Sequence, residues 1–254
     1  MDRTIIVNSF IQLLAHRERV ETGATAFSWG TSTEIRYAST LEWPWPRQFT
    51  YTREFFSQDS STECLQTIHG LKATKEEHVI NFFSTELDAE VAHFEVAGYV
   101  EAWRSELLGR DLSHRWHRRG ATGVEICEVA SSAEMVRYAS LSGISNPGLA
   151  RDGSIHNFFA LNGGEVLAKG QLVYLSDAVA YVSDMFTKPE HRKKGLCASI
   201  LAAIEDKAVS LGATHTCLAP GREVASFGLY EKYGYATAGV RAVLIPKDEV
   251  VPDR

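Results

Sequence analysis

The feature that most constrains this chain is a strand-like segment that runs through a basic loop with a glycine into a helix. The segment from Ala178 to Thr187 is rich in strand-forming residues, and a loop containing Arg192-Lys-Lys-Gly195 follows it. An amphipathic helix is predicted over 196–211, ending before Gly212. Its apolar face consists of Ile200, Leu201, Ile204 and Ala208. The order of strand, glycine-bearing turn, helix and strand predicts an α/β fold.

The predicted start of this helix has the chemistry of an anion site. The first backbone N–H groups of a helix lack partners within it, and the helix dipole places positive charge there. Gly195 lets phosphates approach the backbone closely. Further positive charge comes from Lys188, Arg192, Lys193 and Lys194. The segment therefore indicates a pyrophosphate-binding site, and the alternative is a solvated basic turn that ends in glycine. No Gly-Lys-Ser/Thr sequence occurs, so it is not a Walker loop.

Composition narrows the class of protein. The chain has 254 residues, of which 44% are hydrophobic and 23% are charged, as in an ordinary globular protein of one large or two small domains. No apolar run is long enough for a membrane span, and the first residues do not resemble a signal peptide. The net charge of −6 argues against general nucleic-acid binding.

The cysteines indicate a reducing compartment. All four lie far apart in the sequence and form no Cys-x-x-Cys pair, so neither a disulfide framework nor a zinc site is expected. We therefore expect a cytoplasmic protein that requires no metal and in which these cysteines are small buried apolar residues.

Two domains are expected. All five tryptophans fall at or before residue 116, and the polar stretch 109–123 is charged and ends at Gly123. We predict an N-terminal α/β domain over 1–112, a linker over 113–123 and a second domain over 124–254.

Two motifs carry a family resemblance. The run Thr187-Lys-Pro-Glu-His-Arg-Lys-Lys-Gly-Leu-Cys197 is followed by Leu229-Tyr-Glu-Lys-Tyr-Gly-Tyr235. In this order and spacing they resemble the GNAT superfamily of acetyl-CoA-dependent N-acetyltransferases, over about 124–246. The resemblance implies a mixed central sheet flanked by helices, and an enzyme of EC 2.3.1 type with acetyl-CoA as its co-substrate.

The resemblance also implies roles for individual residues. Strand-edge groups of Met185, Phe186 and Thr187 would pair with the pantetheine arm. Tyr230 would act as general acid toward the departing thiolate, because a phenol carries its proton at neutral pH. The alternative for Tyr230 is a core aromatic on an amphipathic helix. The pyrophosphate would be held by amides of Arg192, Lys193, Lys194, Gly195, Leu196, Cys197 and Ala198.

The sequence departs from the family pattern at two places. Cys197 stands where Gly or Ala is usual in the loop. The Asn that many members carry shortly before the tyrosine is replaced by Arg222-Glu223. The larger side chain of Cys197 reduces the space for phosphates, and the missing Asn removes a side chain that would contact CoA.

The general base is left open among several residues. We select Asp184, because in the family that the sequence resembles the base often comes from the strand before the loop. The alternatives for Asp184 are a solvent-facing strand residue and a hydrogen-bond partner of another group. The other candidates are Ser183, Tyr181, Glu223 and His156.

The N-terminal half contains a weak internal repeat of the second motif. His93-Phe-Glu-Val-Ala-Gly-Tyr99 aligns with Leu229–Tyr235, with Phe94 in place of Tyr230. This favours a degenerate GNAT-like copy without catalytic activity, as in a tandem pair. It would shape the substrate groove or a homodimer contact.

The expected reaction is transfer of an acetyl group to a primary amine by direct attack. The acceptor, a small molecule or a peptide amine, cannot be identified from the sequence, and a longer acyl group stays open. The first rival is a non-catalytic acyl-CoA-binding regulatory module, and the second is an interaction protein in which the basic loop is only surface. Neither a nucleic acid nor a membrane is expected as a partner.

Overall fold

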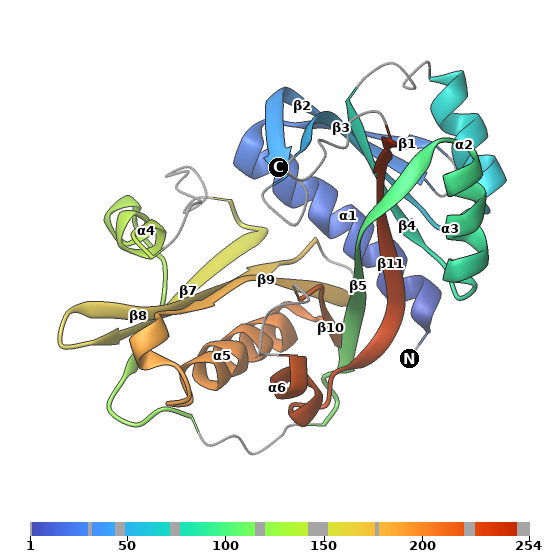
Figure 1. Ribbon diagram of the computed structural model, residues 1–254. Helices are drawn as coiled ribbons and strands as arrows, with labels where there is room; N and C mark the ends of the chain where they lie inside the picture. The colour runs from blue at the N-terminus through green and yellow to red at the C-terminus, as the bar shows by residue number, and fades with distance from the viewer. Residues whose placement is uncertain are drawn as a thin grey trace. The chain divides into compact units, whose positions relative to one another are not determined.

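The computed structural model describes residues 2–29, 32–43, 49–71, 77–114, 120–141, 152–175, 178–220 and 227–247 (Figure 1). They group into two compact units. The first unit comprises Asp2–Leu108, Ala219–Leu229 and Thr237–Arg254, and the second comprises Gly109–Leu218 and Tyr230–Ala236. Each unit therefore contains segments that are separated in the sequence. The linker over 113–123, with domains on either side of it, stays a prediction.

The first unit is a sheet with helices. Its elements are α1 (Arg3–Thr22), β1 (Thr25–Trp29), β2 (Ser32–Trp43), β3 (Phe49–Ser57), α2 (Ser61–Gly70), β4 (His78–Phe83), α3 (Leu87–Val96), most of β5 (Tyr99–Asp111) and most of β11 (Ala236–Pro246). The strand order is β1-β2-β3-β4-β11-β5. β3 and β4 are parallel, whereas β11 is antiparallel to β4.

The second unit is also a sheet with helices. Its elements are β6 (Glu125–Glu128), α4 (Ser132–Ala139), β7 (Ile155–Asn162), β8 (Glu165–Val173), β9 (Val179–Thr187), the 3-10 turn Pro189–His191, α5 (Leu196–Leu211), β10 (His215–Leu218) and half of α6 (Phe227–Lys232). The strand order is β6-β7-β8-β9-β10, antiparallel except for the parallel pair β9 and β10. Mixed sheets flanked by helices confirm the predicted α/β class.

The order of elements is similar in the two units. In each, a strand leads through a helix to a parallel strand, as β3-α2-β4 and as β9-α5-β10. A second helix follows in both cases, and α3 leads to β5 whereas α6 leads to β11, most of which belongs to the first unit. This similarity supports the expectation of a tandem pair, which stays a prediction.

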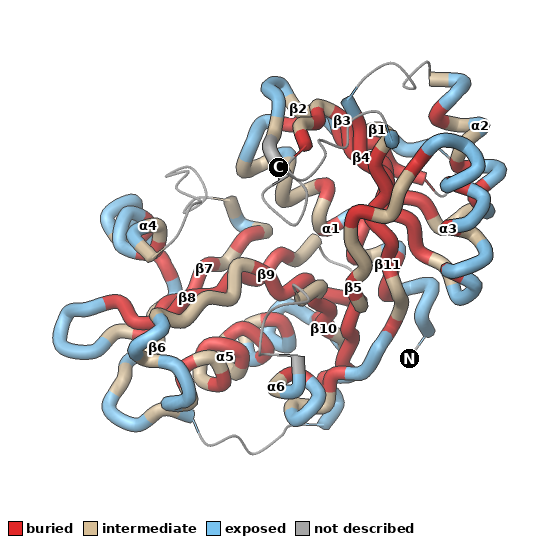
Figure 2. The backbone as a smooth tube through the Cα atoms, in the orientation of Figure 1, coloured by how far each residue is buried: buried red, intermediate tan, exposed pale blue. Residues whose placement is uncertain are grey.

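The helix after the basic loop forms as the sequence predicts. α5 covers Leu196–Leu211, its four expected apolar residues are buried, and Gly212 ends it with a φ of 101°. Figure 2 shows the buried residues gathered along the strands and on the inner side of α5. The run from Glu63 to His69 is rich in strand-forming residues and predicts a strand, but this prediction is wrong. Ser60 and Glu63 form a capping box, which starts α2 instead.

The core of the first unit explains the apolar runs of the N-terminal half. One cluster of buried side chains joins α2 and α3 to β3, β4, β5 and β11. It contains Phe55, Cys64, Ile68, Ile80, Phe82, Leu87, Val91, Phe94, Tyr99, Ala242 and Leu244. Phe94 therefore has a core role, as expected for a position that carries no catalytic group.

All four cysteines are free thiols, with Cys64 and Cys217 buried and Cys127 and Cys197 partly buried. In the part of the chain that the structure describes, no helix is long and apolar enough to cross a membrane.

Candidate active site

A β-bulge interrupts β9 at the predicted site. Asp184 and Met185 both lie opposite Gly170 of β8. The register pairs on either side are Lys169 with Phe186 and Gln171 with Ser183. Asp184 has a φ of 50°, in the left-handed region that Asp tolerates better than most residues. Bulges of this kind change the direction in which a side chain points and are frequent beside active sites.

Gly170 is required by the packing of the bulge. A Cβ at this position would lie 2.5 Å from Sδ of Met185, 2.7 Å from Cγ2 of Ile200 and 3.0 Å from Cδ1 of Ile204. Gly170 therefore faces α5, and Lys169, its neighbour along the strand, faces the other side of the sheet.

The far half of β9 has an open edge. β10 pairs with β9 only from Val179 to Tyr181. Beyond Tyr181, β8 continues to pair with β9 as far as Thr187, whereas no described strand is paired with its other edge. The predicted pantetheine segment, Met185–Thr187, lies in this half, where an extended ligand can add as a strand.

The corresponding parallel pair of the first unit is closed. β3 and β4 are paired from Arg53 through Ser57, the last residue of β3. The helix that follows is capped, since Ser60 accepts a hydrogen bond from the Glu63 amide and the Glu63 carboxylate accepts one from the Ser60 amide. In the first unit, the strand edge and the helix start are thus both occupied by the chain itself.

The start of α5, in contrast, has no side-chain cap. Its N-cap residue, Gly195, has a φ of 83°, and Lys193 before it also has a positive φ of 62°. The amides of the first turn therefore donate no hydrogen bond to a capping side chain, and they stay available to a phosphate.

Gly195 is also required by its neighbours. A Cβ at Gly195 would lie 3.1 Å from the backbone nitrogen of Ala121. The Ala121 amide donates a hydrogen bond of 2.9 Å to Oγ of Ser199, one turn into α5. The glycine thus serves the left-handed turn and the packing of 120–121 as well as the proposed approach of phosphates.

The basic side chains of the loop are exposed. Arg192 donates to the Thr187 carbonyl at 3.2 Å, and no carboxylate among the described residues pairs with Arg192, Lys193 or Lys194. Lys188 differs, because its ammonium is bound to Glu165 at 2.5 Å. Three positive charges therefore remain for an anionic ligand.

Cys197 fits the first turn of α5 without a reactive thiol. It is partly buried, and burial raises the pKa of its thiol to about 11. The neutral thiol form predominates at physiological pH, which lowers its reactivity toward oxidants.

Asp184 lies in a network rather than alone. Its Oδ2 accepts hydrogen bonds from Tyr138 Oη at 2.7 Å and from Lys169 Nζ at 2.6 Å. Sequence analysis missed Lys169 and Tyr138. The signal for Lys169 was a single charge within the apolar strand 166–173.

Tyr230 is buried on the short helix α6, with 5% of its surface exposed. Its backbone carbonyl accepts hydrogen bonds from the amides of Tyr233 and Tyr235. Its ring meets the Tyr235 ring edge to face, with centroids 5.8 Å apart. Tyr235 lies within a buried polar network that sequence analysis also missed.

That network connects β5, α5 and β10 with the turn that contains Tyr235. The Tyr235 hydroxyl donates to Glu205 of α5 at 3.0 Å and lies 2.9 Å from Oγ1 of Thr216 in β10. Arg110, at the end of β5, forms a buried ion pair with Glu205 and donates to the carbonyl of His114. Burial raises the pKa of Glu205, despite Arg110.

The other candidate bases lie elsewhere. His156 is bound to Glu128 at 2.8 Å, and Glu128 also pairs with Lys207 of α5. Ser183 donates to Gln171 at 2.7 Å, and Tyr181 is buried in β9. Glu223, with Arg222, lies outside the described residues. Within the described ranges, no group of three or more His, Cys, Asp or Glu side chains is placed to hold a metal ion.

Comparison with known proteins identifies the second half of the chain. The family model described as "Acetyltransferase (GNAT) family" matches residues 124–235. These residues form a GNAT acetyltransferase domain. The match confirms the resemblance of the two motifs, and it contains every residue of the predicted site. No curated protein matches the chain.

Solved structures show the same fold beyond the GNAT domain. A GCN5-related N-acetyltransferase from Kribbella flavida is similar over 97% of this chain and 95% of its own, with a TM-score of 0.70 and 18% identity. One from Sphaerobacter thermophilus is similar over 88% and 78%, with a TM-score of 0.59 and 9% identity. A conserved protein of unknown function from Staphylococcus epidermidis covers 85% and 96%, with a TM-score of 0.53 and 13% identity. At these identities the likeness establishes the fold, which extends over both units, and not the reaction.

Proposed function

We propose that this chain transfers an acetyl group from acetyl-CoA to a primary amine, by direct attack of the amine on the thioester. The observation that carries the proposal is the uncapped start of α5, which follows directly on the open edge of β9 in a GNAT domain. Membership of an acetyltransferase family supports acyl transfer in general, and the acetyl group and the amine are our proposal.

We assign the residues of the site to two parts of acetyl-CoA, the pantetheine arm and the pyrophosphate. Backbone groups of Met185–Thr187 would pair with the amides of the pantetheine arm, and one N–H would stabilise the oxyanion. Bound acetyl-CoA would supply the thioester carbonyl and a thiolate leaving group. The pyrophosphate would be held by Arg192, Lys193, Lys194, Gly195, Leu196, Cys197 and Ala198.

Tyr230 is proposed as the general acid. Its hydroxyl would donate a proton to the CoA sulfur as the carbon–sulfur bond breaks, so that the free thiol leaves. Burial of Tyr230 and its edge-to-face contact with Tyr235 limit the motion of its ring. Asp184 is proposed as the general base on the amine side, because it directly precedes the pantetheine segment. Its carboxylate would accept the proton that the nitrogen loses as the new carbon–nitrogen bond forms.

Calorimetric titration of acetyl-CoA into the purified chain tests the cofactor. Gly195→Glu would strain the left-handed turn and meet Ala121, so loss of binding in that variant would be ambiguous. Cys197→Asp is the sharper variant, because an acid in the first turn stabilises a helix while it repels phosphates. We expect binding to be lost in Cys197→Asp and kept in the matched Cys197→Ser. Absence of binding to the unchanged chain would refute the proposal.

Release of free CoA thiol with a panel of amines tests turnover. Tyr230→Phe removes one hydroxyl, and we expect kcat to fall by about 100-fold or more while acetyl-CoA binding is unchanged. If the unchanged protein binds acetyl-CoA and no amine is acetylated, the regulatory-module alternative is correct. The cytoplasmic location, the homodimer and the small-molecule or peptide acceptor remain proposals that these experiments do not address.

A further inference from the structure

A charged side chain is fully buried beside Asp184. Lys169 of β8 has no exposed surface, yet it carries an ammonium group. That ammonium lies 2.6 Å from Oδ2 of Asp184 and 4.5 Å from the centre of the Tyr138 ring. A buried ammonium is costly unless a carboxylate and further polar contacts compensate it. An apolar residue would pack in the core here without that cost, so stability alone does not explain a lysine at this position.

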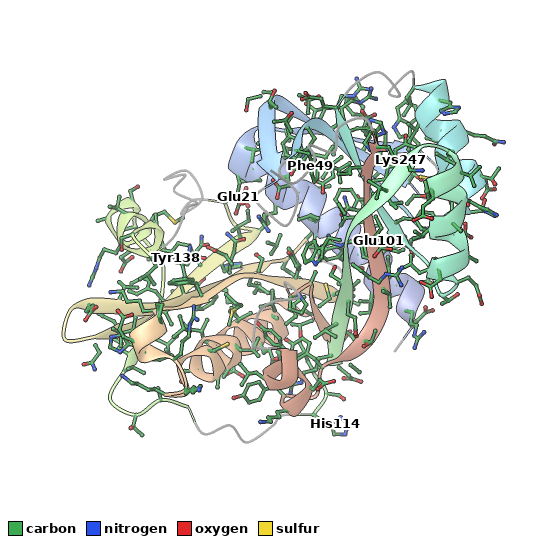
Figure 3. The ribbon with its side chains drawn as sticks, in the orientation of Figure 1. Glu21, Phe49, Glu101, His114, Tyr138 and Lys247 are labelled. Atoms are coloured by element: carbon green, nitrogen blue, oxygen red, sulfur yellow. The ribbon has the colours of Figure 1, made fainter. Side chains whose placement is uncertain are left out.

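The two partners of Asp184 bind the same oxygen. Tyr138 comes from α4 (Figure 3), and its hydroxyl donates to Oδ2 at 2.7 Å. Oδ1 accepts no hydrogen bond from any residue within the described ranges, and the Asp184 side chain keeps 15% of its surface exposed. One carboxylate oxygen is therefore fixed from two sides, and the other is left for a ligand.

The bulge places this carboxylate beside the proposed reaction. Asp184 directly precedes Met185–Thr187, and its left-handed backbone changes the direction of its side chain relative to a regular strand. Lys169 and Tyr138 come from an adjacent strand and from a helix, so three separate elements define the position of one carboxylate.

We propose that Lys169 and Tyr138 are positioning residues that hold Asp184 so that Oδ1 accepts a hydrogen bond from the nitrogen of the acceptor amine. This inference rests on the proposed function and deepens it. Because Lys169 compensates the charge of Asp184, the pair has no net charge, and the site takes up a neutral amine nitrogen as readily as an ammonium. The neutral form is the nucleophile, so this balance keeps the site from stabilising the unreactive ammonium form of the substrate.

Two variants separate the roles of charge and hydrogen bonding. Lys169→Met removes the compensating charge, and Tyr138→Phe removes one hydrogen bond while it keeps the ring. The matched controls are Lys207→Met, which breaks an exposed lysine–carboxylate pair on α5, and Tyr174→Phe, whose hydroxyl lies near Gly212. The probes are acetyl-CoA, benzylamine, which is protonated at neutral pH, and aniline, which is neutral there.

We expect acetyl-CoA to bind both variants with the Kd of the unchanged protein. In Lys169→Met, kcat should fall about tenfold to 100-fold, the scale of a misplaced reacting group. The KM of benzylamine should fall relative to that of aniline, because the site becomes negatively charged. In Tyr138→Phe, kcat should fall about threefold to tenfold, and the ratio of the two KM values should not change.

Several outcomes would overturn the inference. An unchanged KM ratio in Lys169→Met, or a loss of acetyl-CoA binding in step with kcat, would assign the network a purely structural role. Equal effects in the two controls would do the same, as would acetyl-CoA binding without acetylation of either amine by the unchanged protein. If the unchanged protein does not bind acetyl-CoA, the proposed function fails and this inference fails with it.

Discussion

The ring of Tyr230 meets the ring of Tyr235 edge to face across the turn that ends α6. Between them, Gly234 adopts a left-handed φ of 81°, which brings the chain back toward the helix. Tyr235 is in turn held by Glu205 and Thr216. The proposed acid is thereby connected, through one aromatic contact, to a buried polar network under α5.

The first unit contains the same arrangement without the hydroxyl at the acid position. Phe94 meets Tyr99 edge to face with centroids 6.0 Å apart, and Gly98 between them has a φ of 92°. The shared motif therefore has a structural purpose in both units, namely to join a helix to the next strand. A catalytic role can be added at one position of it.

Tyr235→Phe should destabilise the protein and leave catalysis largely intact. The variant loses a hydrogen bond to Glu205 and another to Thr216, both buried, whereas the ring that contacts Tyr230 stays. We expect the free energy of unfolding to fall by about 1–3 kcal/mol. Urea unfolding measures this fall, with Tyr174→Phe as a control that should change little. A large loss of kcat at full stability would show that the hydroxyl itself takes part in the reaction.

Gly170→Ala should be more harmful than an alanine at an open glycine. The new methyl group would meet Met185 and two isoleucines of α5 at 3.0 Å or less. We expect a loss of about 1–3 kcal/mol from overpacking, and weaker acetyl-CoA binding because the bulge must shift. Gly153→Ala, with no atom within 4 Å and no positive φ, is the matched control. Equal unfolding midpoints for the two variants would contradict the packing described here.

Stability should depend on pH through Glu18 of α1. Its pKa is raised from 4.5 to about 7, mainly by burial, with smaller contributions from Glu54 and Glu21, and Arg17 only partly opposes this. Between pH 4.5 and 7 the folded chain retains a proton that the unfolded chain has lost. The free energy of unfolding should therefore fall as pH rises through this window, by at most about 1.4 kcal/mol per unit.

Urea unfolding of the unchanged protein and of Glu18→Gln, at several pH values from 4.5 to 7.5, checks this dependence. The glutamine variant should show a flatter profile, with some slope left because burial also raises the pKa of Glu54. Identical profiles would mean that Glu18 ionises freely in the folded state.

One acetyl-CoA should bind per chain. In the first unit the parallel strands are paired to the end of β3, and the start of α2 is capped by its own side chains. Calorimetry should therefore give a stoichiometry of one, and Cys197→Asp should abolish all binding. A second equivalent that survives in this variant would place another site outside the GNAT domain.

Much of the second unit could be predicted from sequence, because its signals are local. The glycine that begins α5, the apolar face of that helix and Gly212 at its end are adjacent in the chain. The segment from Glu63 to His69 shows the limit of local composition as a guide. Its composition favours a strand, whereas the capping box of Ser60 and Glu63 starts a helix there.

The network around Asp184 was beyond such reasoning. Tyr138 is 46 residues away from Asp184 in the sequence, and only the pairing of β8 with β9 brings Lys169 to the bulge. The bulge itself depends on Gly170, whose packing against α5 cannot be read from local pattern. Side-chain networks that join distant elements require the tertiary structure.

The position of β11 has a consequence for any attempt to divide this protein. β11 follows the GNAT motifs in the sequence, yet it pairs with β4 of the first unit from Arg241 to Leu244. A fragment that stops before residue 124 would leave β4 with a bare, apolar edge, prone to aggregate. A fragment that starts there would carry a strand without its sheet. Each half is therefore expected to depend on the other for folding, and a deletion in either half should destabilise both.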